Sequence, residues 1–407
     1  MVGRVTALGR YTAAHVVTWF GGAMTLVALP ILVFQRTGSA ALTGLLAALE
    51  ALPYFLFGLF AGALADRWDQ GRTMVITAAL SGLVMAGVPV AHWFGMLATD
   101  HLLAAAIATL FVFYDAASFG ALPAIVGRER IGAATGRLSA LSTTIDLAGP
   151  SAAGLLIAGI GVVNLIALDA ASYLLAAGVL ATVRWTPVAR GPGRATIAEG
   201  LAYLWRQPVI RNLTLLGAAH SLAGGAVTGL LVVVGVRRLG LAADDARLGL
   251  LYAAAACGAL LASLAIAGLQ RRYPIGSITL TALTVSGLAL TGWAWNGWWL
   301  PGLFLLVIWQ AGATTVILNA IIVRQTLTPD HLQARVNTTA RMIGWGGTPF
   351  GALLGGLLAE AAGTHIALSA AAALLGAVAV VVASTSVRRV PTLSDLRAPQ
   401  TVGTLLQ

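Results

Sequence analysis

The sequence predicts an all-α membrane protein with twelve transmembrane helices arranged as two six-helix bundles. Three observations lead to this prediction: an extreme composition, twelve long apolar runs, and a likeness between the two halves of the chain. Of the 407 residues, 58% are hydrophobic and only 9% are charged, and the mean hydropathy is +0.89. Soluble proteins carry about 25% charged residues. A chain with so few charges cannot cover its apolar surface in water, which excludes a soluble enzyme.

Twelve apolar runs are long enough to cross a bilayer. A transmembrane helix needs about 20 predominantly apolar residues to cross a hydrocarbon core of about 30 Å. The runs predict helices at residues 12–36, 41–65, 73–97, 101–126, 134–160, 162–184, 212–236, 248–269, 275–296, 298–326, 336–360 and 364–387.

The longest polar gap, residues 184–212, divides these spans six and six. It holds five arginines and three prolines, and its segment around Ile197 to Trp205 is amphipathic. We expect this linker to lie along the membrane surface. The predicted organisation is an N-terminal bundle at 1–184, a cytoplasmic linker at 185–211, a C-terminal bundle at 212–390 and a cytoplasmic tail at 391–407.

The distribution of arginine predicts the orientation. All 24 basic residues are arginine, and the net charge is +10. With a cytoplasmic N-terminus, 20 arginines fall in inner segments and only four, at positions 36, 237, 238 and 247, fall in outer ones. Inner segments of membrane proteins are rich in Lys and Arg. We therefore expect a multi-pass protein of a bacterial inner membrane with both termini inside, and the positive charge needs no nucleic-acid partner.

The two halves repeat one another in the same sense. The segment "LPAIVGRERIGAATGRL" leads into the fifth span and "LTPDHLQARVNTTARMI" leads into the eleventh, and Pro150 and Pro349 follow 199 residues apart. Two six-helix halves repeated in parallel are typical of secondary transporters.

The short segment "GALADRWDQGR", residues 62–72, concentrates charge between two apolar spans. Gly62 permits a close helix crossing. Asp66, at an inner helix end, can pair with the positive N-terminus of a neighbouring helix or with an arginine. Such contacts would form only when the inner ends meet, which makes Gly62, Asp66, Arg67 and Arg72 candidates for a cytoplasmic gate. The alternative is a basic loop that merely fixes topology.

With these residues the chain resembles the major facilitator superfamily, whose loop reads Gly-x-Leu-Ala-Asp-Arg-x-Gly-Arg-Arg. Trp68 and Asp69 depart from that pattern. The departure, together with "RQPVIRN" and "RVNTTARMIGWGGTPFGALL", is similar to the subgroup of macrolide-efflux and enterobactin-export proteins. The resemblance covers nearly the whole chain. It implies the major facilitator fold and nominates the eleventh span as the neighbour of Asp66.

Four carboxylates fall inside the predicted spans: Glu50, Asp115, Asp146 and Asp169. An ionisable residue within a membrane is a functional candidate, because burying its charge is costly. At about 1.5 Å per residue, Asp115 and Asp146 lie at a shared depth, about 17–18 Å from the inner end. Glu50, Asp115 and Asp146 are candidates for proton coupling or for contact with a cationic substrate. For Asp169, near the outer end, we expect a structural hydrogen bond to Ser172 or to backbone.

The fifth span carries Gly149, Pro150 and Gly154 in "AGPSAAGLL". Proline removes a backbone hydrogen bond and bends a helix, and glycine allows close helix packing. This segment resembles the Gly-Pro-x-x-x-Gly signature of exporters, which implies efflux rather than uptake. The alternative is a packing kink without further function.

Polar and aromatic residues on spans one, four, seven and ten are candidates to line a substrate cavity. An apolar cavity with a few polar groups suits amphiphilic drugs or siderophores. The candidates are Trp19, Phe113, Tyr114, His220, Trp309, Gln310 and Asn319.

These features predict a secondary active transporter that exports a small amphiphilic molecule by proton antiport. A proton-coupled importer or facilitator, a transporter-like receptor and a lipid scramblase are the alternatives. The histidines are scattered without metal-ligand spacing and no P-loop is present. We therefore expect no enzyme activity, no cofactor, no metal and no ATP-driven step. The expected partners are the substrate, protons and the lipid bilayer, and a monomer is expected.

Overall fold

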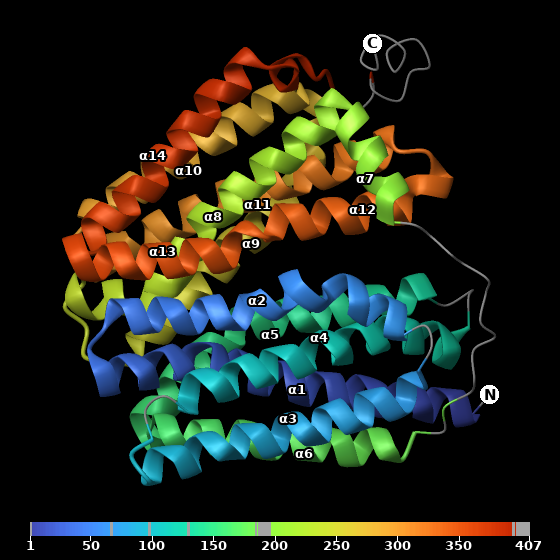
Figure 1. Cartoon of the computed structure of the whole chain (residues 1–407), viewed down its shortest axis with the longest axis vertical. Coiled ribbons are helices and arrows are strands. Elements are labelled where there is room, and N and C mark those ends of the chain that lie inside the picture. Colours follow the sequence, from blue (N-terminus) through green and yellow to red (C-terminus); the bar gives the residue numbers. More distant parts are fainter. Residues whose placement is uncertain are drawn as a thin grey trace. The chain divides into compact units, whose positions relative to one another are not determined.

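The computed structural model describes residues 2–65, 68–96, 99–127, 131–183, 185, 197–392 and 395. Helices and the turns between them account for these residues, and no strand occurs among them (Figure 1). Twelve helices of the described chain are long and apolar enough to cross a membrane. Their positions match the twelve predicted spans, so the all-α membrane fold is confirmed.

The chain forms two compact units, each described here by itself. Unit 1 comprises Met1–Pro192 and Leu241–Ala253, and unit 2 comprises Gly193–Gly240 and Ala254–Gln407. The stretch 241–253 thus groups with the first unit. The domain limits expected at 184 and 211 remain a prediction.

Unit 1 contains six helices in chain order and the beginning of α9. The six are α1 (Val2–Thr37), α2 (Ala40–Ala65), α3 (Gln70–Trp93), α4 (Thr99–Val126), α5 (Ile131–Ile160) and α6 (Val162–Ala181).

Unit 2 opens with the short amphipathic helix α7, at the place where the sequence predicts one. The helices are α7 (Ile197–Arg206), α8 (Pro208–Arg237), α9 (Arg247–Arg272), α10 (Ile275–Trp295), α11 (Trp299–Leu327), α12 (Asp330–Trp345), α13 (Gly347–Ala362) and α14 (Thr364–Ser384), followed by the 3₁₀ helix η2 (Ser386–Arg389).

One glycine makes the turn between the last two spans of each half. Gly161 joins α5 to α6 with a φ of 82°, and Gly363 joins α13 to α14 with a φ of 95°. This backbone region favours glycine because a Cβ atom would clash there. The two turns extend the likeness between the halves to a feature that the spacing of the prolines does not reveal.

The eleventh span differs from its sequence prediction in one respect. It is expected as one helix at 336–360, but α12 ends at Trp345 and α13 begins at Gly347. The backbone N–H of Gly347 donates to the Ser221 hydroxyl of α8 at 3.1 Å, outside the helix ladder. The break lies at consecutive glycines, which have a low preference for a helix interior.

In unit 1, α1 packs along α6, and α3 packs between α4 and α6. A core of buried residues joins α1, α3, α4 and α6, with Tyr11, Met74, Tyr114 and Leu180 among its largest members. In unit 2, α8 packs mainly against α13 and makes a smaller contact with α14, while α10 packs between α11 and α14. Figure 1 shows α8, α13 and α14 as neighbours in this unit.

The four arginines expected on the outer side are all engaged. Arg36 of α1 forms an ion pair with Asp100 of α4 at 2.6 Å, and Asp100 is 1% exposed. Arg237 pairs with Glu360 of α13 at 3.4 Å.

Arg247 at the start of α9 pairs with Asp245 at 2.5 Å. Hydrogen bonds from Arg247 hold the pKa of Asp245 below its ordinary value. Arg238 donates to the carbonyl of Asn296 at 3.1 Å and lies over the ring of Trp295. Three of these four arginines therefore have a carboxylate partner.

Candidate functional site

The segment that the sequence singles out as a gate is only partly described. Asp66 and Arg67 lie outside the described residues, Gly62 lies within α2, and Arg72 is exposed in the first turn of α3. Asp69, part of the departure from the family pattern, caps α3 by accepting a hydrogen bond from the Arg72 backbone N–H at 2.8 Å. Aspartate is among the preferred N-cap residues. The departure therefore places a helix cap directly after the second span.

Asp115 lies in the middle of α4 and is hydrogen-bonded to a side chain of another helix. The hydroxyl of Tyr54 on α2 donates to its carboxylate at 3.0 Å. Both side chains retain some exposure, with Tyr54 37% exposed. A hydroxyl donor stabilises the ionised carboxylate. Tyr54 was not singled out from the sequence, although its hydroxyl is a polar group within an otherwise apolar span, between Pro53 and Phe55.

An aromatic cluster surrounds His15 beside this pair. The His15 ring lies 4.2 Å from Tyr11, 5.2 Å from Trp19 and 5.5 Å from Tyr114 between centroids. His15 is 3% exposed. The structure therefore brings two cavity candidates, Trp19 and Tyr114, together around a histidine that the sequence shows only as one of six scattered histidines.

Phe111 connects the cluster to the Asp115 pair. It stacks on Tyr114 at 6.3 Å and lies 6.3 Å from Tyr54. A row of aromatic rings on α1, α4 and α2 therefore runs from Trp19 to Tyr54, whose hydroxyl donates to the carboxylate of Asp115. Aromatic rings supply a large apolar surface, and their faces attract cations.

Phe113, the third aromatic candidate in unit 1, takes a different direction. It contacts Phe57 of α2 at 6.4 Å and Trp68 at 6.1 Å between centroids. Trp68 is 48% exposed and precedes the cap of α3. Phe113 therefore belongs to the α2–α3 turn rather than to the His15 cluster.

The other two acids proposed for proton coupling occupy separate surroundings. Glu50 is partly buried on α2, and Asp146 is exposed on α5. Among the described side chains, neither is hydrogen-bonded to the Asp115–Tyr54 pair. The three candidates therefore do not form one carboxylate cluster in this structure.

Asp169 has the structural role expected of it. Ser172 donates to one of its carboxylate oxygens at 2.9 Å, which confirms the predicted bond. Thr25 of α1 donates to the other oxygen. The side chain is fully buried, so the two donors satisfy a carboxylate that joins α6 to α1. Thr25 lies 144 residues away in sequence, where no local pattern identifies it.

The candidate export segment on α5 forms close backbone contacts. α5 runs uninterrupted through Pro150. A Cβ at Gly149 would lie 2.6 Å from the Cβ of Ala23 on α1, and one at Gly154 would collide with the carbonyl of Ala246. Gly154 also faces Gly249 at the start of α9. The glycines thus allow α5 to approach two other segments of unit 1.

In unit 2, His220 and Trp309 are 3% and 4% exposed. Neither the Nδ1 atom of His220 nor the Nε1 atom of Trp309 has a hydrogen-bond partner among the described residues. Gln310 is partly buried and donates to Thr314, one turn along α11. Unpaired buried nitrogens are costly in a folded protein, so both are positions where a bound molecule could supply the missing bond.

Asn319 is fully buried and already bonded. Its amide accepts from Gln270 of α9 at 2.7 Å and donates to Thr279 of α10 at 3.1 Å and to the Ile275 carbonyl at 3.3 Å. These bonds tie α11 to the turn between α9 and α10. In this structure the amide of Asn319 is therefore occupied by protein groups rather than turned to a cavity.

Twelve helices of the described chain are long and apolar enough to span a bilayer and carry ionisable side chains, which defines a multi-pass membrane protein. The sequence model of the Major Facilitator Superfamily matches residues 11–347, and the chain belongs to this family. It is a transporter and not an enzyme.

Two kinds of relative share most of the chain. The multidrug efflux pump Tap of Mycolicibacterium fortuitum is 32% identical over 88% of this chain and 91% of its own length. The enterobactin exporter EntS of Salmonella typhimurium is 27% identical over 81% of this chain and 80% of its own length. Both names fall within the subgroup that the sequence motifs indicate.

Solved structures share the fold. The nucleoside transporter NupG superposes with a TM-score of 0.78 at 11% identity, covering 93% of this chain and 99% of its own. A bacterial homologue of the lysosomal transporter Spinster superposes with a TM-score of 0.75 at 16% identity, covering 98% and 99%. At such identities the likeness concerns the fold alone.

Proposed function

We propose that this transporter exports a small amphiphilic molecule from a bacterial cell in exchange for protons, by alternating access, with both termini on the cytoplasmic side of the inner membrane. Export is supported by the relatives, which are described as a multidrug efflux pump and an enterobactin exporter. The residues 62–72 then act as the cytoplasmic gate, with Gly149, Pro150 and Gly154 as the close-packed segment of an exporter.

The observation that carries the coupling step is the Asp115–Tyr54 pair beside the aromatic cluster. A carboxylate at membrane depth favours its neutral, protonated form unless a partner stabilises the charge. A cationic or polar part of the substrate and a proton would then compete for Asp115, while the rings hold the apolar part. Competition for one group ties the entry of a proton to the exit of a substrate.

The test uses inside-out membrane vesicles with an imposed proton gradient and a panel of lipophilic drugs. Asp115→Asn, Glu50→Gln and Asp146→Asn each imitate a protonated acid. At least one of these variants should reduce gradient-driven accumulation by tenfold or more, of the order seen when a proton-transfer group is removed. The same variant should retain drug exchange without a gradient.

Two controls sharpen the result. Asp244→Asn changes an exposed acid in the loop before α9 and should transport normally. Tyr54→Phe keeps the Asp115 carboxylate and removes the Tyr54 hydroxyl, so the pH dependence of transport should differ from that of the wild type. If all three acid variants accumulate drug normally against a gradient, coupling does not use these acids. Drug release rather than accumulation in inside-out vesicles would indicate import.

A further inference from the structure

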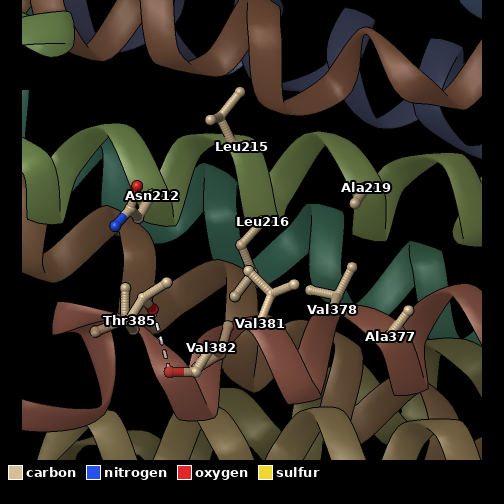
Figure 2. Close-up of a pocket in the computed structure, with 10 residues that line it drawn as sticks. Asn212, Leu215, Leu216, Ala219, Ala377, Val378, Val381, Val382 and Thr385 are labelled. Atoms are coloured by element: carbon tan, nitrogen blue, oxygen red, sulfur yellow. Dashed lines mark hydrogen bonds between the residues drawn. The ribbon is translucent and has the colours of Figure 1, made fainter.

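A groove lies between α8 and α14 in unit 2 and has no part in the function proposed above. It has a volume of about 240 Å³. Figure 2 shows its walls, which come from the first half of α8 and the last part of α14 with η2. The lining residues are Asn212, Leu215, Leu216, Ala219, Ala377, Val378, Val381, Val382, Thr385 and Val387.

The groove is polar at one end and apolar along the rest. Asn212 and Thr385 lie together at one end, and Ala219 and Ala377 lie at the other (Figure 2). Asn212 stands near the start of α8 and Thr385 follows the last residue of α14, so the polar end lies at the predicted cytoplasmic surface. From Asn212 to Ala219 the helix rises about 10 Å. This length suits the first part of an acyl chain that enters from the inner leaflet.

The packing of α8 explains why the groove is open. Two glycines of α8 face α13: a Cβ at Gly225 would collide with Thr348, and one at Gly229 would press on Ala352. The helices of unit 1 that correspond to α8 and α14 are α1 and α6. These two are in close contact at Gly21 and Asp169. Because α8 packs closely against α13, a space remains between α8 and α14. The equivalent space between α1 and α6 in unit 1 is filled.

Two arginines are sequence neighbours of residues that line the groove. Arg211 precedes Asn212 on α8, and Arg388 follows Val387 in η2. Arg211 is partly buried and Arg388 is exposed. Neither forms an ion pair with another described residue, unlike the outer arginines with carboxylate partners. Basic positions between membrane helices on the cytoplasmic side attract anionic lipid headgroups.

The groove also opens to the surface of the unit. Leu215 is 44% exposed and Val381 is 58% exposed, both within spanning helices. An apolar opening at membrane depth is accessible to lipid tails. We propose that this groove binds one acyl chain of an anionic phospholipid whose phosphate is held by Arg211 and Arg388. The site depends on the predicted orientation of the chain and not on the direction or coupling of transport.

The experiment measures lipid binding to the full-length protein in mild detergent by native mass spectrometry. The probes are dioleoyl phosphatidylglycerol and, with the same chains, dioleoyl phosphatidylcholine. The wild-type protein should bind phosphatidylglycerol more tightly. Loss of both charges in Arg211→Gln/Arg388→Gln should weaken that binding about fivefold for each arginine, and should weaken binding of phosphatidylcholine less, because choline neutralises its phosphate. The matched control is Arg271→Gln/Arg272→Gln at the end of α9, which should bind like the wild type.

A second pair of variants tests the acyl-chain part. Ala377→Trp fills the groove and should weaken binding of both lipids, whereas Val380→Trp places the same ring on α14 outside the lining and should not. Equal phosphatidylglycerol binding by the Arg211/Arg388 variant and the wild type would overturn the headgroup assignment. Displacement of the lipid by inorganic phosphate, or by an exported drug, would show that another molecule is the occupant. Equal effects of the two tryptophans would show that the groove is not the site.

Discussion

In unit 1 a buried carboxylate fastens the first helix to the sixth, whereas in unit 2 glycines press the corresponding helix against its neighbour. Asp169 accepts hydrogen bonds from Thr25 and Ser172 across the α1–α6 contact. Across the α8–α13 contact, a Cβ at Gly351 would collide with the backbone of Leu222. The two halves share one topology, yet the α1–α6 contact contains buried polar bonds, whereas the α8–α13 contact presses glycines against backbone atoms.

The difference predicts which substitutions each half tolerates. A side chain can move away from a new methyl group, but a backbone carbonyl in a helix cannot without disturbing its own hydrogen bond. The α8–α13 contact should therefore be sensitive to added volume, and the Asp169 part of the α1–α6 contact to the loss of polar partners. Both helices offer a matched control, because Gly225 of α8 and Gly21 of α1 are preceded or followed by a glycine, Gly224 or Gly22 respectively, that faces open space.

The largest effect is expected for Gly225→Ala in α8. Its Cβ would overlap the carbonyl of Thr348, and overpacking of this kind costs about 1–3 kcal/mol. Gly224→Ala adds the same atom where nothing lies within 4 Å, so its stability should be unchanged or higher. Thermal unfolding in detergent and the monodisperse yield measure the difference. Equal melting temperatures for the two variants would contradict the close contact of α8 with α13.

A loss of the same order is expected for Asp169→Asn in α6. The amide keeps one acceptor oxygen where two hydroxyls donate, so one donor is left facing an N–H group in the buried contact. A buried unsatisfied group costs about 1–3 kcal/mol. The melting temperature of the purified variant should fall, while Gly22→Ala on the open side of α1 should not change it. A melting temperature for Asp169→Asn equal to that of the wild type would contradict the role of the Asp169 hydrogen bonds in stabilising the α1–α6 contact.

The smallest effect is expected for Ser221→Ala in α8. This hydroxyl accepts the hydrogen bond of the Gly347 N–H at the break between α12 and α13. Loss of one hydrogen bond costs about 0.5–1.5 kcal/mol. Ser263→Ala is the control, because its exposed hydroxyl donates only one turn back, to Ala259. Hydrogen exchange of the Gly347 amide should accelerate in Ser221→Ala alone, and unchanged exchange would show that the break does not need this bond.

The extent to which the sequence predicts this structure depends on how far apart the interacting residues lie. The spans follow from local apolar runs, and the bond between Ser172 and Asp169 follows from neighbours three residues apart. The donor from Thr25 and the Tyr54–Asp115 pair join distant segments, 144 and 61 residues apart, and no local pattern contains them. His15 is one scattered histidine in sequence and the centre of a ring cluster in space.

The same limit applies to breaks and buried amides. The sequence predicts a helix bend at Pro150, where α5 continues as one helix, and it does not predict the break of the eleventh span at Gly346. A proline inside a membrane helix is tolerated where neighbouring groups satisfy the freed backbone, and sequence alone does not report those neighbours. Its position on the tenth span made Asn319 a candidate for the cavity. Its hydrogen-bond partners lie on α9 and α10, and the sequence does not indicate them.

The ion pairs of the outer arginines have a consequence for the order of events during synthesis. Arg36 is made 64 residues before Asp100, and Arg237 is made 123 residues before Glu360. When the first helix enters the membrane, Arg36 therefore carries its charge with no partner yet in existence. In the predicted orientation, the more numerous arginines kept inside drive the passage of Arg36 to the outer side, and its charge is neutralised only when the fourth helix arrives. The ion pairs therefore form after the orientation of the first helix has been set, and they can stabilise that orientation but cannot determine it.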